Sequence, residues 1–125
     1  MELGAIVRTI LVVDDEFGVA DVLAAALEDE GYRVVTAANG QQGIDRVAEQ
    51  RPDVILTDFM MPVMDGPTMA RALQGDGEKA IPIIMMSAMP EAAVRERFAG
   101  YFGFLRKPFR LHTVADLVAK ALADR

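Results

Sequence analysis

The feature that most constrains this sequence is a fivefold alternation between short apolar runs and longer segments with helical spacing. Apolar runs of about five residues, rich in Val and Ile, are typical of strands that are buried on both faces of a sheet. These runs predict five strands, over residues 9–13, 33–36, 53–57, 80–86 and 101–105. Apolar residues that recur every three or four positions predict helices over residues 17–30, 41–50, 65–73, 90–100 and 112–123.

A helix in each connection specifies parallel neighbours, because parallel strands need a long crossover. Right-handed crossovers place such helices on both faces of the sheet. We therefore predict an α/β fold, a doubly wound five-stranded parallel sheet, in one domain over residues 1–125. Gly31 and Arg51-Pro52 are natural stops for the first two helices, and residues 75–78 predict a loop after the third.

The composition suits a folded domain and excludes several classes of protein. With 52% hydrophobic and 26% charged residues, the chain is too apolar for a disordered segment. It has no Cys, which excludes disulfides and thiolate metal ligands. Residues 1–4 lack the features of a signal peptide, and no apolar stretch approaches the ~20 residues of a membrane span. We expect a soluble, cytoplasmic protein without membrane contact.

The net charge of −6 argues against nucleic-acid binding by this chain, since that function usually needs a basic surface. The charge is also uneven along the sequence. Residues 1–62 carry 4 basic and 12 acidic side chains, whereas residues 63–125 carry 9 basic and 7 acidic ones. Two interpretations stay open: random scatter, or an acidic pole for a cation and a more basic face for a partner.

Polar side chains follow four of the predicted strands. Asp14-Asp15 come after the first, Asp58 after the third, Ser87 after the fourth and Lys107 after the fifth. Ligands of open α/β sheets bind at the carboxyl ends of the strands, where these side chains would meet. Three adjacent carboxylates repel one another, and a hard divalent ion such as Mg²⁺ or Mn²⁺ would relieve that repulsion. A carboxylate nucleophile, a metal, an ammonium and a hydroxyl are the groups that phosphoryl transfer to aspartate requires.

Each of these residues also has a structural interpretation. Asp14-Asp15 and Ser87 are good helix caps, Asp58 suits a loop, and Lys107 suits a solvated surface. The four signals together, in register with four strand ends, favour the phosphoryl-transfer site.

Four segments carry a resemblance to a known family: ILVVDDE at 10–16, LTDFMMPVMDG at 56–66, SA at 87–88 and FLRKPF at 104–109. In this order they resemble the receiver domain of bacterial two-component response regulators, of the single-domain chemotaxis-regulator kind. The resemblance implies a flavodoxin-like (βα)5 fold with strand order 2-1-3-4-5. It also implies a phosphorylation-activated signalling switch rather than an enzyme.

The partners implied by the resemblance are a sensor histidine kinase or phosphotransfer protein as donor and a downstream protein as target. Such a domain works as a monomer or as a phosphorylation-dependent homodimer. Asp58 matches the phospho-acceptor, which is also a metal ligand, and Asp14 and Asp15 match the acidic pair that binds the metal. The backbone carbonyl of Met60 matches the third protein ligand, and Lys107 matches the lysine that pairs with the phosphoryl group.

By the same resemblance, Ser87 matches the switch hydroxyl and Phe104 the switch aromatic, which move together on phosphorylation. The face of the fourth helix, fifth strand and fifth helix would then change. Pro108 matches a proline often joined to the lysine by a cis peptide bond. Asp65-Gly66 matches a turn in which Gly permits backbone angles that other residues resist.

The sequence departs from the family pattern between residues 87 and 100, a segment about two residues shorter than usual. Tyr101 and Phe102 stand where small or acidic residues are commoner. They either fill space beside a shortened helix or form an aromatic anchor for a partner. Four arginines are expected nearby, each of which by itself suits a solvated rim: Arg95, Arg97, Arg106 and Arg110.

Two further expectations concern the switch. Phe104 lacks a hydroxyl group and loses no hydrogen bond on burial, so we expect it to be biased inward even without phosphate. Met60 and Met89 lie two residues after Asp58 and Ser87, and neither can orient water by hydrogen bonding. We therefore expect slow self-dephosphorylation.

Other functions were weighed against this one. Phosphatases of the haloacid-dehalogenase type also use an Asp nucleophile and Mg²⁺, but they carry a second Asp where this chain has Met60. A degenerate receiver would lack an acid or the lysine, and all are present here. The chain ends at Arg125, just after the last predicted helix. Two interpretations stay open: a stand-alone regulator, which a full-length chain would favour, or one piece of a longer protein.

Overall fold

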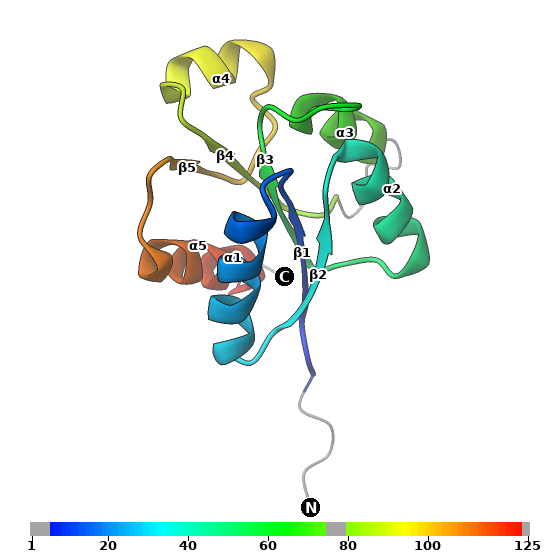
Figure 1. The fold of residues 1–125 in the computed structure, drawn as a ribbon, viewed down its shortest axis with the longest axis vertical. Coiled ribbons are helices and arrows are strands. Elements are labelled where there is room, and N and C mark those ends of the chain that lie inside the picture. The colour runs from blue at the N-terminus through cyan, green and yellow to red at the C-terminus, as the bar shows by residue number, and fades with distance from the viewer. Residues whose placement is uncertain (1–5, 75–79, 124–125) are drawn as a thin grey trace, which may run out of the picture.

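The computed structural model describes residues 6–74 and 80–123. The loop predicted at 75–78 and the expectation for residues 1–4 lie outside the described residues. Within them, strands and helices alternate along the chain (Figure 1). The strands are β1 (Thr9–Val13), β2 (Arg33–Ala37), β3 (Val54–Asp58), β4 (Ile83–Ser87) and β5 (Gly103–Arg106). The helices are α1 (Phe17–Asp29), α2 (Gly40–Glu49), α3 (Gly66–Leu73), α4 (Glu91–Arg97) and α5 (Leu111–Ala123).

The five strands form one parallel sheet in the order β2-β1-β3-β4-β5, which confirms the predicted topology. The strand order reverses at β1, because β2 pairs on one side of it and β3 on the other. The carboxyl ends of β1 and β3 therefore lie side by side at the switch point, where ligands of such sheets bind.

Alternate residues of the central strands face opposite layers. Ile10 and Val12 pack with α1 and α5, whereas Leu11 and Val13 pack with the α2, α3 and α4 layer. In Figure 1, α1 and α5 accordingly cover one face, and α2 and α3 cover the other. All residues of β1, β3 and β4 are buried, which explains why these strands read as continuous apolar runs.

Three predicted boundaries are wrong by more than one residue, and all lie between residues 80 and 103. β4 begins at Ile83 rather than Ala80, since Pro82 has no N–H for the ladder and only accepts, from Ile55 N at 3.0 Å. α4 ends at Arg97 rather than Gly100, because Phe98 is extended (φ −159°, ψ 119°) and buries its ring in the α2–α4 layer. β5 begins at Gly103 rather than Tyr101.

The other boundaries agree within one residue, for recognisable local reasons. Gly31 adopts φ 97° just after α1, which is the left-handed conformation that ends helices. The side chains of Asn39 and Asp65 cap α2 and α3 by accepting from backbone N–H groups, each at 2.9 Å. Among the described residues, no helix is long and apolar enough to span a bilayer.

Candidate functional site

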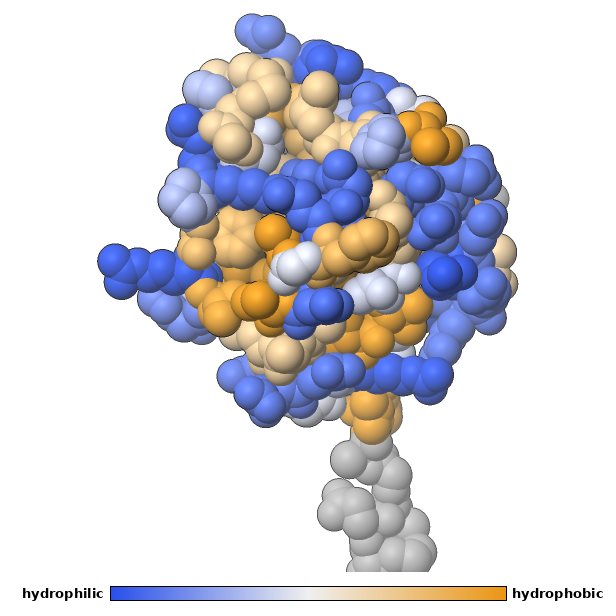
Figure 2. Space-filling model, in the orientation of Figure 1, coloured by the Kyte–Doolittle hydropathy of each residue, from blue (hydrophilic) through white to orange (hydrophobic). Residues whose placement is uncertain are grey.

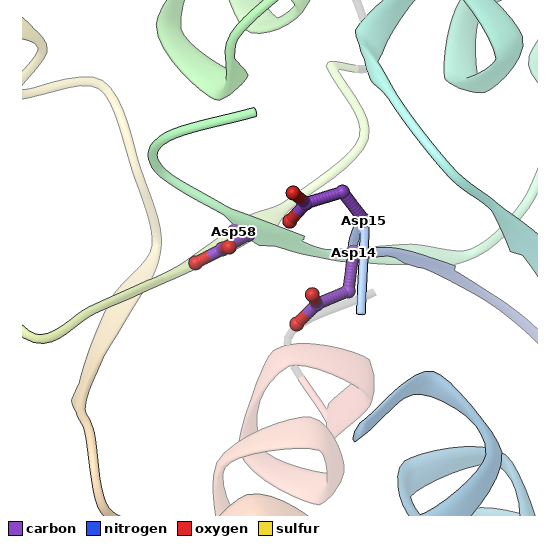
Figure 3. Close-up of side chains that lie close together, drawn as sticks. All are labelled: Asp14, Asp15 and Asp58. Carbon is purple, nitrogen blue, oxygen red and sulfur yellow. The ribbon is translucent and has the colours of Figure 1, made fainter. Parts of the chain in front are cut away.

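Two neighbouring strands bring the three predicted acidic residues together. Asp58 is the last residue of β3, and Asp14 and Asp15 directly follow β1. One carboxylate oxygen from each lies within 4.8 Å of those of the other two. Figure 3 shows the three carboxylates pointing into one shared space. Asp14 and Asp58 are only 1% and 8% exposed, whereas Asp15 is exposed, so the cluster is open to solvent on one side.

Lys107 reaches the same cluster from the end of β5. Its ammonium Nζ lies 3.0 Å from Asp58 Oδ1, 3.5 Å from Asp14 Oδ2 and 3.9 Å from Glu16 Oε1. The backbone N–H of Lys107 also donates to the carbonyl of Ser87 at 2.8 Å, which anchors the residue to β4. The interpretation of Lys107 as a solvated surface residue is therefore wrong.

The peptide bond between Lys107 and Pro108 is cis, as the sequence resemblance implied.

The surroundings of Asp58 and Lys107 shift the pKa values of both side chains. Burial raises the pKa of Asp58 from 3.8 to about 6; the hydrogen bond from Lys107 opposes that shift and the charge of Asp14 adds to it. Burial by itself lowers the pKa of Lys107, but its contacts with Asp58 and Asp14 more than reverse this, so the pKa lies above its ordinary value. Asp58 thus holds a charge that its surroundings only partly compensate.

The residues of the cluster fit a hard divalent cation. Asp14 Oδ1 accepts from Glu16 N at 2.9 Å, but Asp14 Oδ2 is buried without a hydrogen-bond partner. A buried carboxylate oxygen in that position is costly unless a cation satisfies it, and the Lys107 ammonium stays 3.5 Å away. All the donors are oxygens, which Mg²⁺ and Mn²⁺ prefer.

Ser87 ends β4 and is 4% exposed. Its Oγ accepts a hydrogen bond from Met89 N at 3.0 Å, so the side chain stabilises the turn after β4. It does not cap α4, because the N-cap position of that helix belongs to Pro90. The alternative interpretation of Ser87 as a helix cap is therefore wrong.

Of the three aromatic residues before and in β5, two are partly buried and one is exposed. Phe104 is partly buried against the α2–α4 layer, and its ring centroid lies 6.1 Å from that of Tyr101. Tyr101 packs on the same layer and donates its hydroxyl to Glu91 Oε2 at 2.6 Å, whereas Phe102 is 40% exposed. Tyr101 therefore fills space beside α4, and Phe102 is the aromatic residue that stays available to a partner.

Gly66 is required for a different reason from the one implied by the sequence. Among the described glycines, only Gly31 has a positive φ, so unusual backbone angles do not explain Gly66. A Cβ at Gly66 would instead lie 2.5 Å from the backbone carbonyl oxygen of Asp58. Gly66 N also donates to Phe59 O at 3.0 Å. The absence of a side chain lets α3 begin directly against the backbone of β3 at Asp58.

Val63 was not singled out by its sequence, yet it is strained. Its φ is 68°, and Met64 N donates to Pro62 O across it at 2.7 Å, which closes a three-residue turn. A β-branched residue is rare in this region of backbone space. A sequence pattern could not reveal this, because Val favours the opposite conformation. Val63 is also 83% exposed, so the loop that follows Asp58 carries a strained apolar tip.

Comparison with known proteins places the chain in a family. Residues 10–119 match the model for the response regulator receiver domain. The response regulator MprA of Mycobacterium tuberculosis is 40% identical over 118 residues, covering 91% of this chain and 49% of that protein. Sporulation initiation phosphotransferase F of Bacillus subtilis is 35% identical over 115 residues, covering 90% of this chain and 92% of that protein.

A solved structure agrees with these sequence matches. The chemotaxis response regulator CheY4 of Vibrio cholerae superposes with a TM-score of 0.86 at 30% identity, covering 94% of this chain and all of that one. The chain therefore belongs to the response regulator receiver domain family, and it is a phosphorylation-activated signalling switch of two-component systems. It spans about half the length of MprA. A haloacid-dehalogenase-type phosphatase is not favoured, since Met60 replaces the second acid of that family.

Proposed function

We propose that Asp58 is the residue that accepts the phosphoryl group, from a histidine kinase or a phosphotransfer protein. The observation that carries this assignment is the position of Asp58: it is buried at the end of β3, 3.0 Å from the Lys107 ammonium and beside two further carboxylates. A carboxylate oxygen of Asp58 forms the new O–P bond while the P–N bond of the donor phosphohistidine breaks. The electron pair of that bond stays on the imidazole nitrogen.

The remaining residues stabilise charge rather than form bonds. Asp14, Asp15, Asp58 and the carbonyl of Met60 would hold a divalent ion. When bound, Mg²⁺ or Mn²⁺ supplies positive charge to phosphoryl oxygens. Lys107 supplies a second positive charge, from an ammonium that its carboxylate neighbours keep protonated. Because the site transfers a group to the protein itself, the role is signalling and not turnover of a separate substrate.

The response to phosphorylation involves Ser87 and Phe104. The new phosphoryl oxygens are strong hydrogen-bond acceptors and attract the Ser87 hydroxyl. Movement of Ser87 toward Asp58 opens space beside β4, and Phe104, already partly buried there, moves further inward. The face formed by α4, β5 and α5 then presents a new surface to a downstream protein. The phosphorylated domain acts either as a monomer or as a homodimer. Phosphorylation of Asp58 thus shifts the population from the resting state to the active state.

An apolar surface next to the site supports a protein as phosphoryl donor. Phe17 and Val22 on α1 are 75% and 53% exposed, and Leu111 at the start of α5 is 42% exposed. A groove of about 300 Å³ runs between α1 and the chain that leads into α5. Figure 2 shows apolar side chains gathered over the region of α1, with hydrophilic side chains around them. Exposed apolar patches of this kind typically bind protein partners.

The experiment that tests the proposal is intact-mass spectrometry after incubation with acetyl phosphate, with and without Mg²⁺. We expect one added phosphoryl group that depends on Mg²⁺ and is absent in Asp58→Asn. Asp116→Asn, on the exposed side of α5, removes the same charge and should label like the wild type. Labelling of Asp58→Asn would contradict the assignment. If a histidine kinase labels the wild type but acetyl phosphate does not, the domain accepts phosphoryl groups only from a protein donor. If neither donor labels it, the proposal is wrong and the domain is a scaffold.

The expected slow dephosphorylation is measured in the same assay. Met60 and Met89 are 58% and 36% exposed, so both thioethers are at the surface beside the acceptor and the switch residue. The label should persist for many minutes after removal of acetyl phosphate, and Met60→Asn should shorten that time by supplying a group that orients water. A wild-type lifetime of only seconds would contradict this expectation. The cytoplasmic location stays a prediction.

A further inference from the structure

Arg106 holds the segment that follows the switch hydroxyl. It is the last residue of β5 and lies opposite Ser87 in the sheet register. Its guanidinium Nε donates to the carbonyl oxygen of Ala88 at 2.8 Å. The next residue, Lys107, donates its backbone N–H to the carbonyl of Ser87 at 2.8 Å. Two consecutive residues at the end of β5 thus bind two consecutive carbonyls at the end of β4.

The Ser87 hydroxyl is engaged within the same segment. Its oxygen accepts from Met89 N at 3.0 Å, so residues 87–89 form a closed turn. The Arg106 bond closes that turn from outside, because it spans 18 residues and ties the turn to β5. If the Ser87 hydroxyl moves toward Asp58, it releases Met89 N, and the peptide unit to which that N–H belongs is the one whose carbonyl, on Ala88, accepts from Arg106. The bond from Arg106 to Ala88 then lengthens or breaks.

We propose that Arg106 is a positioning residue that holds residues 87–89 in the resting geometry and thereby opposes activation. This inference rests on the proposed function of Asp58 and Ser87. The single bond from Arg106 acts against the attraction of the phosphoryl oxygens for the Ser87 hydroxyl. A hydrogen bond of this kind, on a partly solvated surface, shifts a two-state equilibrium by about fivefold. Arg106 therefore sets how much of the unphosphorylated protein already occupies the active state.

The test replaces Arg106 with Met, which keeps the length of the aliphatic chain and removes the donor. Arg110→Met is the matched control, because Arg110 is exposed, lies four residues away and carries the same charge. The first measurement is the NMR signal of the Met89 methyl group, in protein labelled with ¹³C at its methionine methyls. Met89 directly follows Ala88, so its signal reports the geometry of the segment and not general stability.

We expect the Met89 signal of unphosphorylated Arg106→Met to lie part of the way toward its position in phosphorylated wild type. The rate of labelling by acetyl phosphate at fixed Mg²⁺ should rise about fivefold over wild type, since the active geometry is populated more often. Arg110→Met should match wild type in both measurements.

Three results would overturn the inference, and they separate it from the proposed function. In the first, wild type is labelled on Asp58, but Arg106→Met and Arg110→Met do not differ in their Met89 signal or in their rate of labelling. Arg106 then has no positioning role, and the proposed function stands. If wild type is never labelled, the proposed function fails and the opposing role of Arg106 fails with it. A rate below that of Arg110→Met would show that Arg106 assists activation rather than opposing it.

Discussion

The carboxylate cluster and α4 both lie at the carboxyl edge of the sheet, but the chain holds them by different means. Asp14 and Asp58 extend from β1 and β3, each of which pairs with a neighbouring strand on both sides. Among the described helices, α4 is the shortest, with seven residues, of which only Val94 is buried. The residues that we propose for phosphoryl transfer are thus held by the sheet, whereas α4 is held by one buried residue and by surface side chains.

The contacts of α4 are nevertheless specific, above all at its C-terminal end. The guanidinium of Arg97 lies 5.6 Å from the centroid of the Phe59 ring, and its Nη2 is 3.9 Å from Asp65 Oδ2. In return, Arg71 of α3 lies 5.9 Å from the Phe98 ring and donates to the carbonyl of Arg97. This crossed pair of arginines connects α4 to Phe59, the residue next to Asp58. Exposed contacts of this kind contribute only about 0.5 kcal/mol each.

Firmly paired and weakly held regions thus match the two tasks that we propose for them. Phosphoryl transfer needs carboxylates in fixed positions, which strand ends with full backbone pairing provide. A switch needs two arrangements of similar free energy, which weak and separable contacts provide. Four experiments test this contrast.

The largest effect is expected on the rigid side, from Gly66→Ala. The new Cβ would lie 2.5 Å from the carbonyl oxygen of Asp58, a backbone atom that the sheet prevents from moving. We expect the free energy of unfolding to fall by about 3 kcal/mol, measured by urea denaturation. Gly18→Ala is the control, since nothing lies within 4 Å of a Cβ there, and it should stabilise helix α1 slightly. Equal effects at both positions would show that the edge is not rigid.

The next effect is the pH dependence of stability, measured in a buffer that contains a metal chelator. The pKa of Asp58 is raised to about 6 from 3.8 in the folded protein, so between these values the folded state binds more protons than the unfolded state. The contribution of Asp58 to the free energy of unfolding is therefore largest below pH 4 and is lost as the pH rises through 6. We expect this slope in wild type relative to Asp58→Asn, from urea midpoints at several pH values. A pH-independent difference between the two proteins would contradict it.

A divalent cation should stabilise the same cluster. At a Mg²⁺ concentration ten times its dissociation constant, binding to the folded state adds about 1.4 kcal/mol. We expect a corresponding rise in the thermal midpoint of wild type. Asp14→Asn, which removes the buried oxygen without a hydrogen-bond partner, should lose that rise, and Asp116→Asn should keep it. An equal Mg²⁺ response in all three proteins would mean that the cation binds elsewhere.

The smallest effect on stability is expected on the mobile side, from Arg97→Ala. Its side chain is 56% exposed, so the ion pair with Asp65 and the contact with Phe59 together should contribute about 0.5–1 kcal/mol. The local effect should be larger than the global one: amide hydrogens of α4 should exchange faster, while those of β3 stay protected. A loss of protection in β3 as well would show that the two regions form one cooperative unit.

Much of this architecture was predictable from local patterns. The apolar runs identified the strands, and Asp58, Ser87 and Lys107 were found because each follows such a run. The strand order followed from the family resemblance, and the rule that open α/β sheets bind ligands at the carboxyl edge then placed Lys107 near Asp58. The end of α4 was not predictable, since Phe98 leaves the helix to bury its ring among residues that are distant in sequence.

The sequence by itself determined the alternation of strands and helices and the identity of the acidic cluster, because periodicity and strand-end residues are local properties of the chain. The order of the strands was implied by the resemblance to a known family. Only the tertiary structure decided which contacts these residues make: the close approach of Gly66 to Asp58, the strained Val63, and the bond from Arg106 to Ala88. These depend on distances between separate elements. Packing sets such distances, and packing is a property of the whole chain.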